Sequence, residues 1–143
     1  LSLPTLMRYE TYVNSRSLHN TPPVFAVYVL SLVTSWIREQ GGLEEMASRN
    51  KRKAAKLYAH IDRTDFYRGT SHPASRSDMN VTLRLPTADL DAQFVSSAAD
   101  NGLVGLKGHR SVGGQRASIY NAFPEDGVNA LVDFMGEFER TNG

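Results

Sequence analysis

The sequence contains no cysteine, which excludes disulfide bonds, thiolate zinc sites and a thiol nucleophile. An excess of charge of one sign is missing as well, because 16 Lys and Arg face 15 Asp and Glu and leave a net charge of +1. No whole-protein field attracts nucleic acid or an anionic membrane, so any anion binding must be local. The lack of cysteine fits a reducing compartment, and we expect a cytoplasmic protein with no nucleic-acid or membrane partner.

Long hydrophobic runs are missing too. The most apolar run, residues 24–37, is 14 residues long and includes Ser31, Thr34 and Ser35, so it is too short to cross a bilayer. The four histidines show no metal-ligand spacing, and no HExxH, GxSxG, Walker or GxGxxG pattern occurs. The sequence therefore predicts no metal site, and it gives no support to a serine hydrolase or a nucleotide-binding protein.

What the sequence does contain is the composition and periodicity of a folded domain, with 143 residues of which 41% are hydrophobic. Hydrophobic spacing and capping signals predict helices near residues 24–40, 43–61, 87–101 and 124–138, and strands near 66–67, 79–85, 103–106 and 117–120. This order predicts an α/β sandwich, with helices packed on one face of a small, mostly antiparallel sheet.

Three finer expectations come from the same periodicity. Residues 1–19 lack a sustained period and are predicted to be a loop. The helix at residues 24–40 is apolar almost all the way round, which indicates a helix buried on most faces. The basic run Lys51 to Lys53 is interpreted as a solvated helix face rather than a nucleic-acid site.

Basic and imidazole side chains gather in one stretch, residues 107–116, which reads KGHRSVGGQR. The side chains are those of Lys107, His109, Arg110 and Arg116, and the glycines are Gly108, Gly113 and Gly114. Glycines let the backbone turn sharply, and a guanidinium offers a planar fork to a carboxylate or phosphate. The stretch is either an anion-binding clamp or a hairpin whose basic residues pair with surface Asp or Glu.

A second candidate lies at the start of the helix that follows Pro22 and Pro23. Asn20 and Thr21 are small polar residues just before this helix, where exposed amide hydrogens and the helix dipole favour a phosphate or carboxylate. Ordinary N-capping explains the same two residues equally well.

Three strings together resemble the C-terminal part of the phosphoserine aminotransferases, pyridoxal-phosphate enzymes of fold type I. They are SLHNTPP at residues 17–23, WIREQGG at 36–42 and KGHRSVGGQRASIYNA at 107–122. The resemblance implies an amino-group transfer between L-glutamate and 3-phosphohydroxypyruvate, which gives 2-oxoglutarate and O-phospho-L-serine. It also implies a homodimer, a role in serine biosynthesis and, in many bacteria, a related role in vitamin B6 biosynthesis.

The resemblance assigns roles to individual residues. It implies that Arg116 holds the substrate α-carboxylate, and that His109 with Arg110 holds the distal carboxylate or phosphate. Asn20 and Thr21 are expected to reach across the homodimer to the cofactor phosphate of the partner subunit. The Schiff-base lysine is expected upstream of this chain, so the chain contains no catalytic residue, Lys107 has no catalytic role, and the chain alone is expected to be inactive.

The resemblance also suggests three parts: a tail of the large domain with the cofactor-phosphate loop at residues 1–23, connecting helices at 24–63 and the small domain at 64–143. Two positions depart from the usual pattern, His19 where Tyr is common and Ser75 where Asn is common. The alternatives are another fold type I enzyme, such as an alanine-glyoxylate type aminotransferase, and a stand-alone anion-binding module.

Overall fold

The computed structural model describes residues 2–143, so Leu1 of the predicted first part lies outside the described residues. The chain forms two compact units, the first ending at Gly42 and the second comprising Leu43–Gly143. The predicted division into parts with separate roles, at residues 23 and 63, stays a prediction.

The first unit begins with two short helical elements where the sequence predicted a loop. A 3-10 helix, η1 (Thr5–Met7), leads into α1 (Tyr9–Asn14). Side chains fix this segment locally, because Thr11 Oγ1 donates to the Thr5 carbonyl at 2.8 Å and the Tyr12 hydroxyl donates to the Leu6 carbonyl at 3.1 Å. These side-chain bonds replace the periodic apolar face that the sequence lacks.

The main helix of the first unit is α2 (Val24–Glu39), which starts directly after Pro22 and Pro23 as predicted. The prediction that it is buried on most faces is wrong for the described residues, since none of its residues is buried. Its exposed large apolar side chains are Val24, Phe25, Val27, Tyr28, Val29, Leu30, Leu32 and Val33. An apolar surface of this kind is typical of a helix that packs inside a larger assembly.

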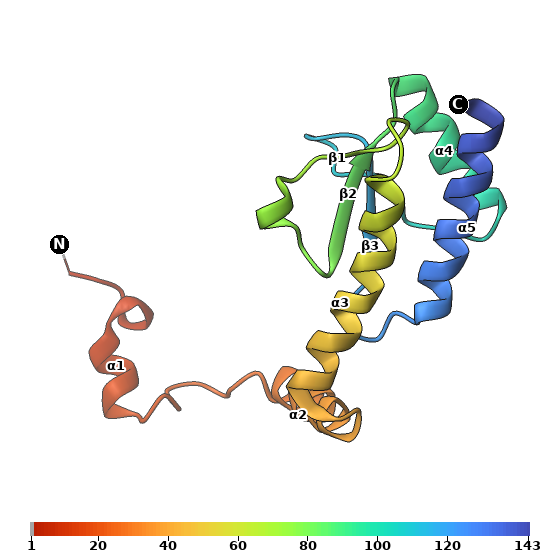
Figure 1. Cartoon of the computed structure of the whole chain (residues 1–143). Helices are drawn as coiled ribbons and strands as arrows, with labels where there is room; N and C mark the ends of the chain where they lie inside the picture. Colours follow the sequence, from red (N-terminus) through yellow and green to blue (C-terminus); the bar gives the residue numbers. More distant parts are fainter. Residues whose placement is uncertain (1) are drawn as a thin grey trace. The chain divides into compact units, whose positions relative to one another are not determined.

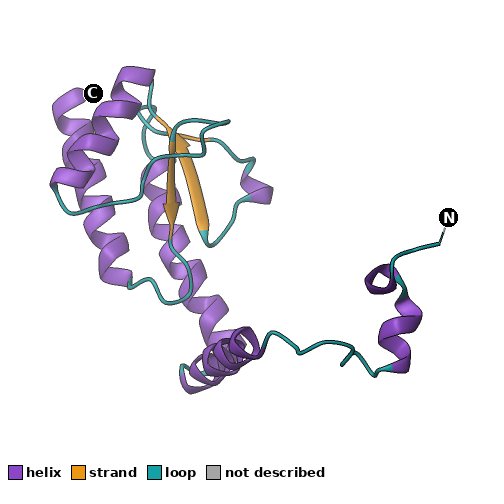
Figure 2. Cartoon of the chain, turned by 180° about the vertical axis from the view of Figure 1, so that it is seen from behind, coloured by secondary structure: helices purple, strands orange, loops and turns teal. Residues whose placement is uncertain are grey.

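The second unit is a three-stranded antiparallel sheet with helices on one face. The strands β1 (Arg68–Gly69), β2 (Asn80–Arg84) and β3 (Gln115–Ser118) lie in the order β1-β2-β3, and the helices are α3 (Gly42–Ile61), α4 (Ala88–Asp100), α5 (Glu125–Asn142) and the 3-10 turn η2 (Pro73–Ser75). Figures 1 and 2 show α3, α4 and α5 on the same side of the sheet. The predicted α/β sandwich is confirmed.

Strand alternation separates the core from a polar face. On β2 and β3 the residues Val81, Leu83 and Ala117 are buried against the helices. Their partners in the core include Leu57 of α3, Phe94 of α4 and Met135 of α5. The residues between them point the other way, and this outer face of the sheet carries Asn80, Thr82, Arg84, Arg116 and Ser118, all only partly buried.

Two predicted strands differ from the structure. The predicted strand at residues 66–67 is displaced: strand β1 begins at Arg68, and the rings of Phe66 and Tyr67 meet edge to face with their centroids 5.0 Å apart. The predicted strand at residues 103–106 does not form in the described chain, where only Lys107 makes an isolated bridge, to Gln115. Gly105 has a φ of 79°, which breaks the extended backbone there.

Lys53 also differs from its prediction as part of a solvated face. It lies in α3 and is 0% exposed, among the largest fully buried side chains of the described residues. By contrast, the predicted N-cap of α4 is confirmed, since Thr87 accepts a side-chain hydrogen bond from the Leu90 amide at 3.2 Å.

One buried histidine couples the fold to pH. His60 of α3 is 6% exposed, its Nδ1 lies 3.3 Å from Arg63 Nη2, and its Nε2 lies 3.9 Å from Glu139 Oε2. A guanidinium only donates, so Nδ1 accepts and the neutral ring carries its proton on Nε2. Burial, and then the Arg63 charge, lowers the pKa of His60 below 6.5, while Glu139 offsets part of the shift.

We expect the free energy of unfolding to fall as pH is lowered from about 7.5 to about 5.5, because the unfolded chain binds the His60 proton more readily than the folded one. Urea unfolding of wild type and of His60→Gln at the two pH values measures the change in the free energy of unfolding. We expect a smaller change with pH in the variant. His72→Gln, at an exposed position, is the control. An equal slope in wild type and His60→Gln would show that His60 is not the titrating group.

Candidate functional site

Arg116 lies on the outer face of the sheet, in the middle of β3. It stands opposite Thr82 in the antiparallel register, between the buried residues Gln115 and Ala117. Its backbone amide donates to the Leu106 carbonyl at 2.8 Å, while the strand on which it lies pairs with β2 on the opposite edge. Its Nε is buried and has no hydrogen-bond partner among the described residues. Arg116 therefore presents donors from a fixed backbone position.

Residues 107–114 fold into a tight hairpin that carries His109 and Arg110. The Gly108 amide donates to the Gly114 carbonyl at 2.8 Å, which closes the hairpin at its base. At its tip the amides of Val112 and Gly113 both donate to the His109 carbonyl, at 2.9 and 2.8 Å. The loop thus has its own hydrogen bonds, and the His109 carbonyl accepts the two at its tip.

Sterics require the glycines of this hairpin. Gly113 and Gly114 have φ values of 75° and 65°, in the region that favours glycine. A Cβ on Gly108 would lie 2.2 Å from the Gly113 carbonyl oxygen, and one on Gly114 would lie 2.6 Å from the Leu83 carbonyl oxygen. The expectation that glycines allow the sharp turn is confirmed, and it includes close backbone approach as well as unusual φ angles.

The imidazole of His109 is oriented by Ser111. Its Nδ1 lies 2.7 Å from the Ser111 hydroxyl and accepts a hydrogen bond from the Ser111 amide at 3.3 Å. An accepting Nδ1 places the proton of the neutral ring on Nε2. Since the ring is exposed, this N–H is available as a donor to an anion.

Arg110 lines a hollow of about 560 Å³ beside the hairpin, together with Lys107 and Arg84. Arg84 comes from β2 and its Nη2 donates to the Val112 carbonyl, so it fastens the tip of the hairpin to the sheet. Sequence reasoning missed Arg84, although its place among the polar positions of the alternating strand was the signal that could have found it. The hollow gathers three cations in one place.

The only acidic residue in the lining of this hollow is already engaged by the scaffold. Asp91 Oδ1 accepts from the Leu85 amide at 2.9 Å and from Gln115 Nε2 at 2.9 Å. These bonds connect the start of α4 to the first residue of β3. Asp91 therefore positions the strand and does not pair with the basic residues.

The basic residues of the hairpin have no acidic partners within the described chain. The ion pairs seen among the described residues are Arg52–Glu45, Lys56–Glu125, His60–Glu139, Arg76–Asp62 and Arg140–Glu137. None of them includes Lys107, His109, Arg110 or Arg116. The alternative of a hairpin that pairs its charges with surface carboxylates is thus not what the described residues form, and the arrangement is suited to an external anion.

Asn20 and Thr21 belong to the first unit, whereas His109, Arg110 and Arg116 belong to the second. Asn20 and Thr21 are exposed. Their one side-chain hydrogen bond is a long one, 3.5 Å, from Asn20 Nδ2 to the Thr21 carbonyl. The N-cap residue of α2 is Pro23, and no side chain caps this helix. The N-capping explanation is therefore not observed, and both side chains remain available to a ligand.

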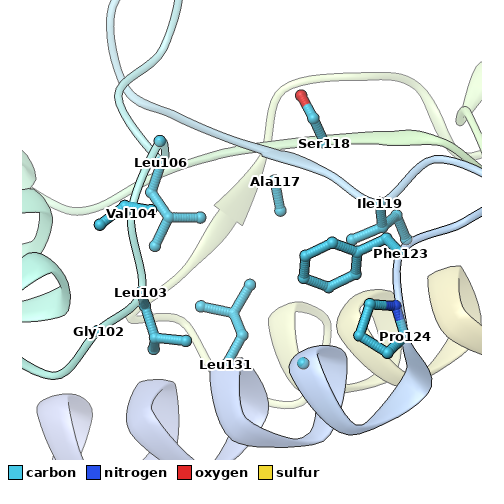
Figure 3. Close-up of a pocket in the computed structure, with 12 residues that line it drawn as sticks. Gly102, Leu103, Val104, Leu106, Ala117, Ser118, Ile119, Phe123, Pro124 and Leu131 are labelled. Carbon is cyan, nitrogen blue, oxygen red and sulfur yellow. The ribbon is translucent and has the colours of Figure 1, made fainter.

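A second hollow, about 420 Å³, lies along the free edge of β3 and is mainly apolar. Figure 3 shows its wall, with Leu103, Leu131 and Phe123 among the side chains and Ser118 directed away from them. It lacks charged side chains among its lining residues, so it does not belong to the anion site. At this hollow the end of β3 has no neighbouring strand on the edge opposite β2.

The described residues contain no group of three or more His, Asp or Glu side chains that is able to hold a metal ion. Among the same residues, no helix is long and apolar enough to span a membrane.

Comparisons with known proteins agree with one another. The pattern described as Aminotransferase class-V matches residues 3–131. Phosphoserine aminotransferases from Desulfatibacillum aliphaticivorans and Syntrophobacter fumaroxidans are 57% and 58% identical over 99% of this chain, which spans 40% and 39% of their lengths. The chain therefore corresponds to about two fifths of these relatives.

Solved structures give the same result for the fold. A phosphoserine aminotransferase from Bacillus circulans subsp. alkalophilus is 52% identical with a TM-score of 0.90, covering 99% of this chain and 39% of that one. A pyridoxal-phosphate-bound phosphoserine aminotransferase from Trichomonas vaginalis is 41% identical with a TM-score of 0.83, covering 94% of this chain and 39% of that one.

The geometry of the hairpin predicts that Gly108→Ala displaces it, because the new Cβ would overlap two carbonyl oxygens. We expect the affinity for inorganic phosphate to fall by roughly tenfold, since a binding site must be held within a fraction of an ångström. The measurement is a phosphate titration followed by amide NMR shifts of residues 107–116. Gly136→Ala in α5, where φ is not positive and an added Cβ meets only the His60 ring at 3.6 Å, is the matched control and keeps the affinity. Equal phosphate affinity in the two variants would contradict the steric argument.

Proposed function

Because the chain belongs to the family of class-V aminotransferases, we propose that it is part of a phosphoserine aminotransferase. The observation that carries the proposal is that three basic or imidazole side chains, His109, Arg110 and Arg116, have no acidic partner in the described chain. Its relatives of that name, which match 99% of the chain, support the same assignment.

The proposed reaction moves an amino group between L-glutamate and 3-phosphohydroxypyruvate, with 2-oxoglutarate and O-phospho-L-serine as products. All four compounds carry an α-carboxylate and a second anion, a carboxylate or a phosphate. A site for them needs two separate anion-binding places and little else that is specific. A strand-borne arginine and a hairpin-borne His-Arg pair meet this requirement.

Arg116 is proposed to bind the α-carboxylate, the group that every substrate shares. Its strand position keeps the guanidinium in place, and a bidentate contact fixes the orientation of the carbon that reacts. The buried Nε without a hydrogen-bond partner supports this role, because an unpaired buried donor is costly until an acceptor arrives.

His109 and Arg110 are proposed to bind the distal anion. Their hairpin is exposed and is fastened to the sheet mainly through Arg84, so it adjusts more easily than a strand. This suits an anion that is a planar carboxylate in one substrate and a tetrahedral phosphate in the other. The Nε2–H of His109 and the fork of Arg110 supply donors for both.

Pyridoxal phosphate is the proposed cofactor, and when bound it supplies the carbonyl carbon that takes up and releases the amino group. Asn20 and Thr21 would hold its phosphate, since they are exposed polar residues beside the uncapped start of α2. In the proposed homodimer they serve the partner subunit. No lysine of this chain is assigned to the Schiff base, and we propose that the chain alone has no activity.

The proposal extends to the place of the reaction in metabolism. Formation of O-phospho-L-serine implies a role in serine biosynthesis, and a related role in vitamin B6 biosynthesis and a cytoplasmic location remain predictions of the resemblance.

An assay of the full-length protein with glutamate and 3-phosphohydroxypyruvate tests the reaction, and an assay with alanine and glyoxylate tests the alternative. Turnover with only the second pair would contradict the proposal.

Arg116→Lys in the full-length enzyme is expected to weaken binding of both amino-acid substrates by roughly 1–3 kcal/mol, since a bidentate charged contact is lost. Steady-state kinetics with glutamate and with O-phospho-L-serine measure it, and KM rises for both. Arg140→Lys, at an exposed pair with Glu137, is the control. Unchanged KM values for Arg116→Lys would remove this residue from the site.

Arg110→Met is expected to act on the distal anion instead. Its KM should rise most for O-phospho-L-serine, by about tenfold or more, because a doubly charged phosphate depends on the guanidinium more than a carboxylate does. Steady-state kinetics of one preparation with glutamate and with O-phospho-L-serine give the increase in KM for each substrate, and the two increases are compared. An equal effect on L-alanine, which has no distal anion, would show that Arg110 does not contact that group.

A further inference from the structure

A buried lysine lies behind the strand that carries Arg116. Lys53 of α3 is 0% exposed, yet its ammonium makes hydrogen bonds with three backbone carbonyls. It donates to Ile119 at 3.0 Å, Tyr120 at 2.7 Å and Phe123 at 3.1 Å. An ammonium has three donors, so all of them are used.

Burying the ammonium group of Lys53 costs free energy, and its hydrogen bonds offset this cost. A buried charge is unfavourable unless it is fully hydrogen-bonded. Burial first, and repulsion from Arg49 second, lowers the pKa of Lys53, while Glu125 acts in the opposite direction. No carboxylate forms an ion pair with Lys53 in the described chain. The three carbonyls are therefore the main compensation for its charge.

The three carbonyls belong to one short segment, residues 119–123, which joins the end of β3 to the start of α5. The Phe123 amide donates to the Tyr120 carbonyl at 2.9 Å and closes a turn there. One turn before Lys53 on α3, Asn50 Nδ2 donates to Asn121 Oδ1 at 2.8 Å. Asn50 and Lys53, one turn apart on α3, thus both bind the segment that joins β3 to α5.

The end of β3 depends on this support because it has a strand on one edge only. β2 pairs with β3 through Ser118, and the Ile119 amide donates to the Met79 carbonyl at 2.9 Å. On the other edge the backbone contacts end at Arg116, whose amide bonds to Leu106. Beyond that point the apolar hollow of Figure 3 lies beside Ala117 and Ile119. The backbone that follows β3 is instead held from α3, by the hydrogen bonds of Lys53.

We propose that Lys53 is a positioning residue for the α-carboxylate site: its ammonium fixes the end of β3 and thereby holds Arg116 in register with Thr82. Only two residues separate Arg116 from the first carbonyl that Lys53 binds. A strand this short transmits a shift at Ile119 directly to Arg116, since both belong to one extended segment. The proposal rests on the proposed function for its kinetic readout, but its structural readout does not require activity.

The test compares Lys53→Met with Leu57→Ala in the full-length enzyme. Methionine keeps most of the volume and removes the three hydrogen bonds. Leu57 is also 0% exposed, lies one turn further along α3 and packs in the same core, so its truncation destabilises the domain without touching the carbonyls. Hydrogen exchange of a peptide covering residues 115–123 is measured in both variants, together with KM and kcat for glutamate and O-phospho-L-serine.

We expect Lys53→Met to speed exchange in residues 115–123 and to raise both KM values by about tenfold, because both substrates share the α-carboxylate, with a smaller change in kcat. Leu57→Ala lowers thermal stability and speeds exchange throughout the core, without a selective effect on residues 115–123, and leaves both KM values near wild type. Two results overturn the proposal: unchanged KM values and exchange in Lys53→Met, or the same changes in both variants. If wild type has no transaminase activity, the proposed function fails, while the exchange comparison still decides whether Lys53 fixes the strand.

Discussion

The antiparallel pairing of β2 with β3 is the constraint on which the site depends. Its register sets Arg116 opposite Thr82 and Ala117 opposite Val81. Because side chains alternate, this register buries alanine and valine against the helices and turns arginine outward. A slip by one residue would move Arg116 into the core and Ala117 to the surface. The same pairing that builds the core therefore decides where the guanidinium points.

The supports around this pairing are buried or partly buried polar side chains that come from the helices. Asp91 accepts from the Leu85 amide and from the Gln115 side chain at the start of β3. Lys53 donates to three carbonyls after its end. A strand of four residues has few ladder bonds of its own, so buried polar side chains that bind its first residue and the segment after it add support. Both ends of β3 are thus anchored to helices, one to α4 and one to α3.

Local signals in the sequence predicted much of this arrangement. The alternation of Val81, Leu83 and Leu85 identified β2, and Thr87 identified the start of α4. The glycine and arginine pattern of residues 107–116 identified the hairpin, because its tight turn depends on residues close in sequence. Lys53 was misjudged, since it binds carbonyls 66 to 70 residues away and a basic run on a helix ordinarily faces solvent. Such burial depends on tertiary contacts and leaves no local pattern.

The strand and the hairpin divide the proposed binding task by their rigidity. Arg116 sits between two buried neighbours, whereas His109 and Arg110 sit on an exposed loop held by Arg84 and by glycine geometry. In a reaction with two substrates in turn, the shared carboxylate must be held identically while the second anion changes in shape and charge. A rigid strand suits the first demand, because misplacement at the reacting carbon is costly. An adjustable hairpin suits the second, so the two parts of this small domain match the two parts of the proposed substrates.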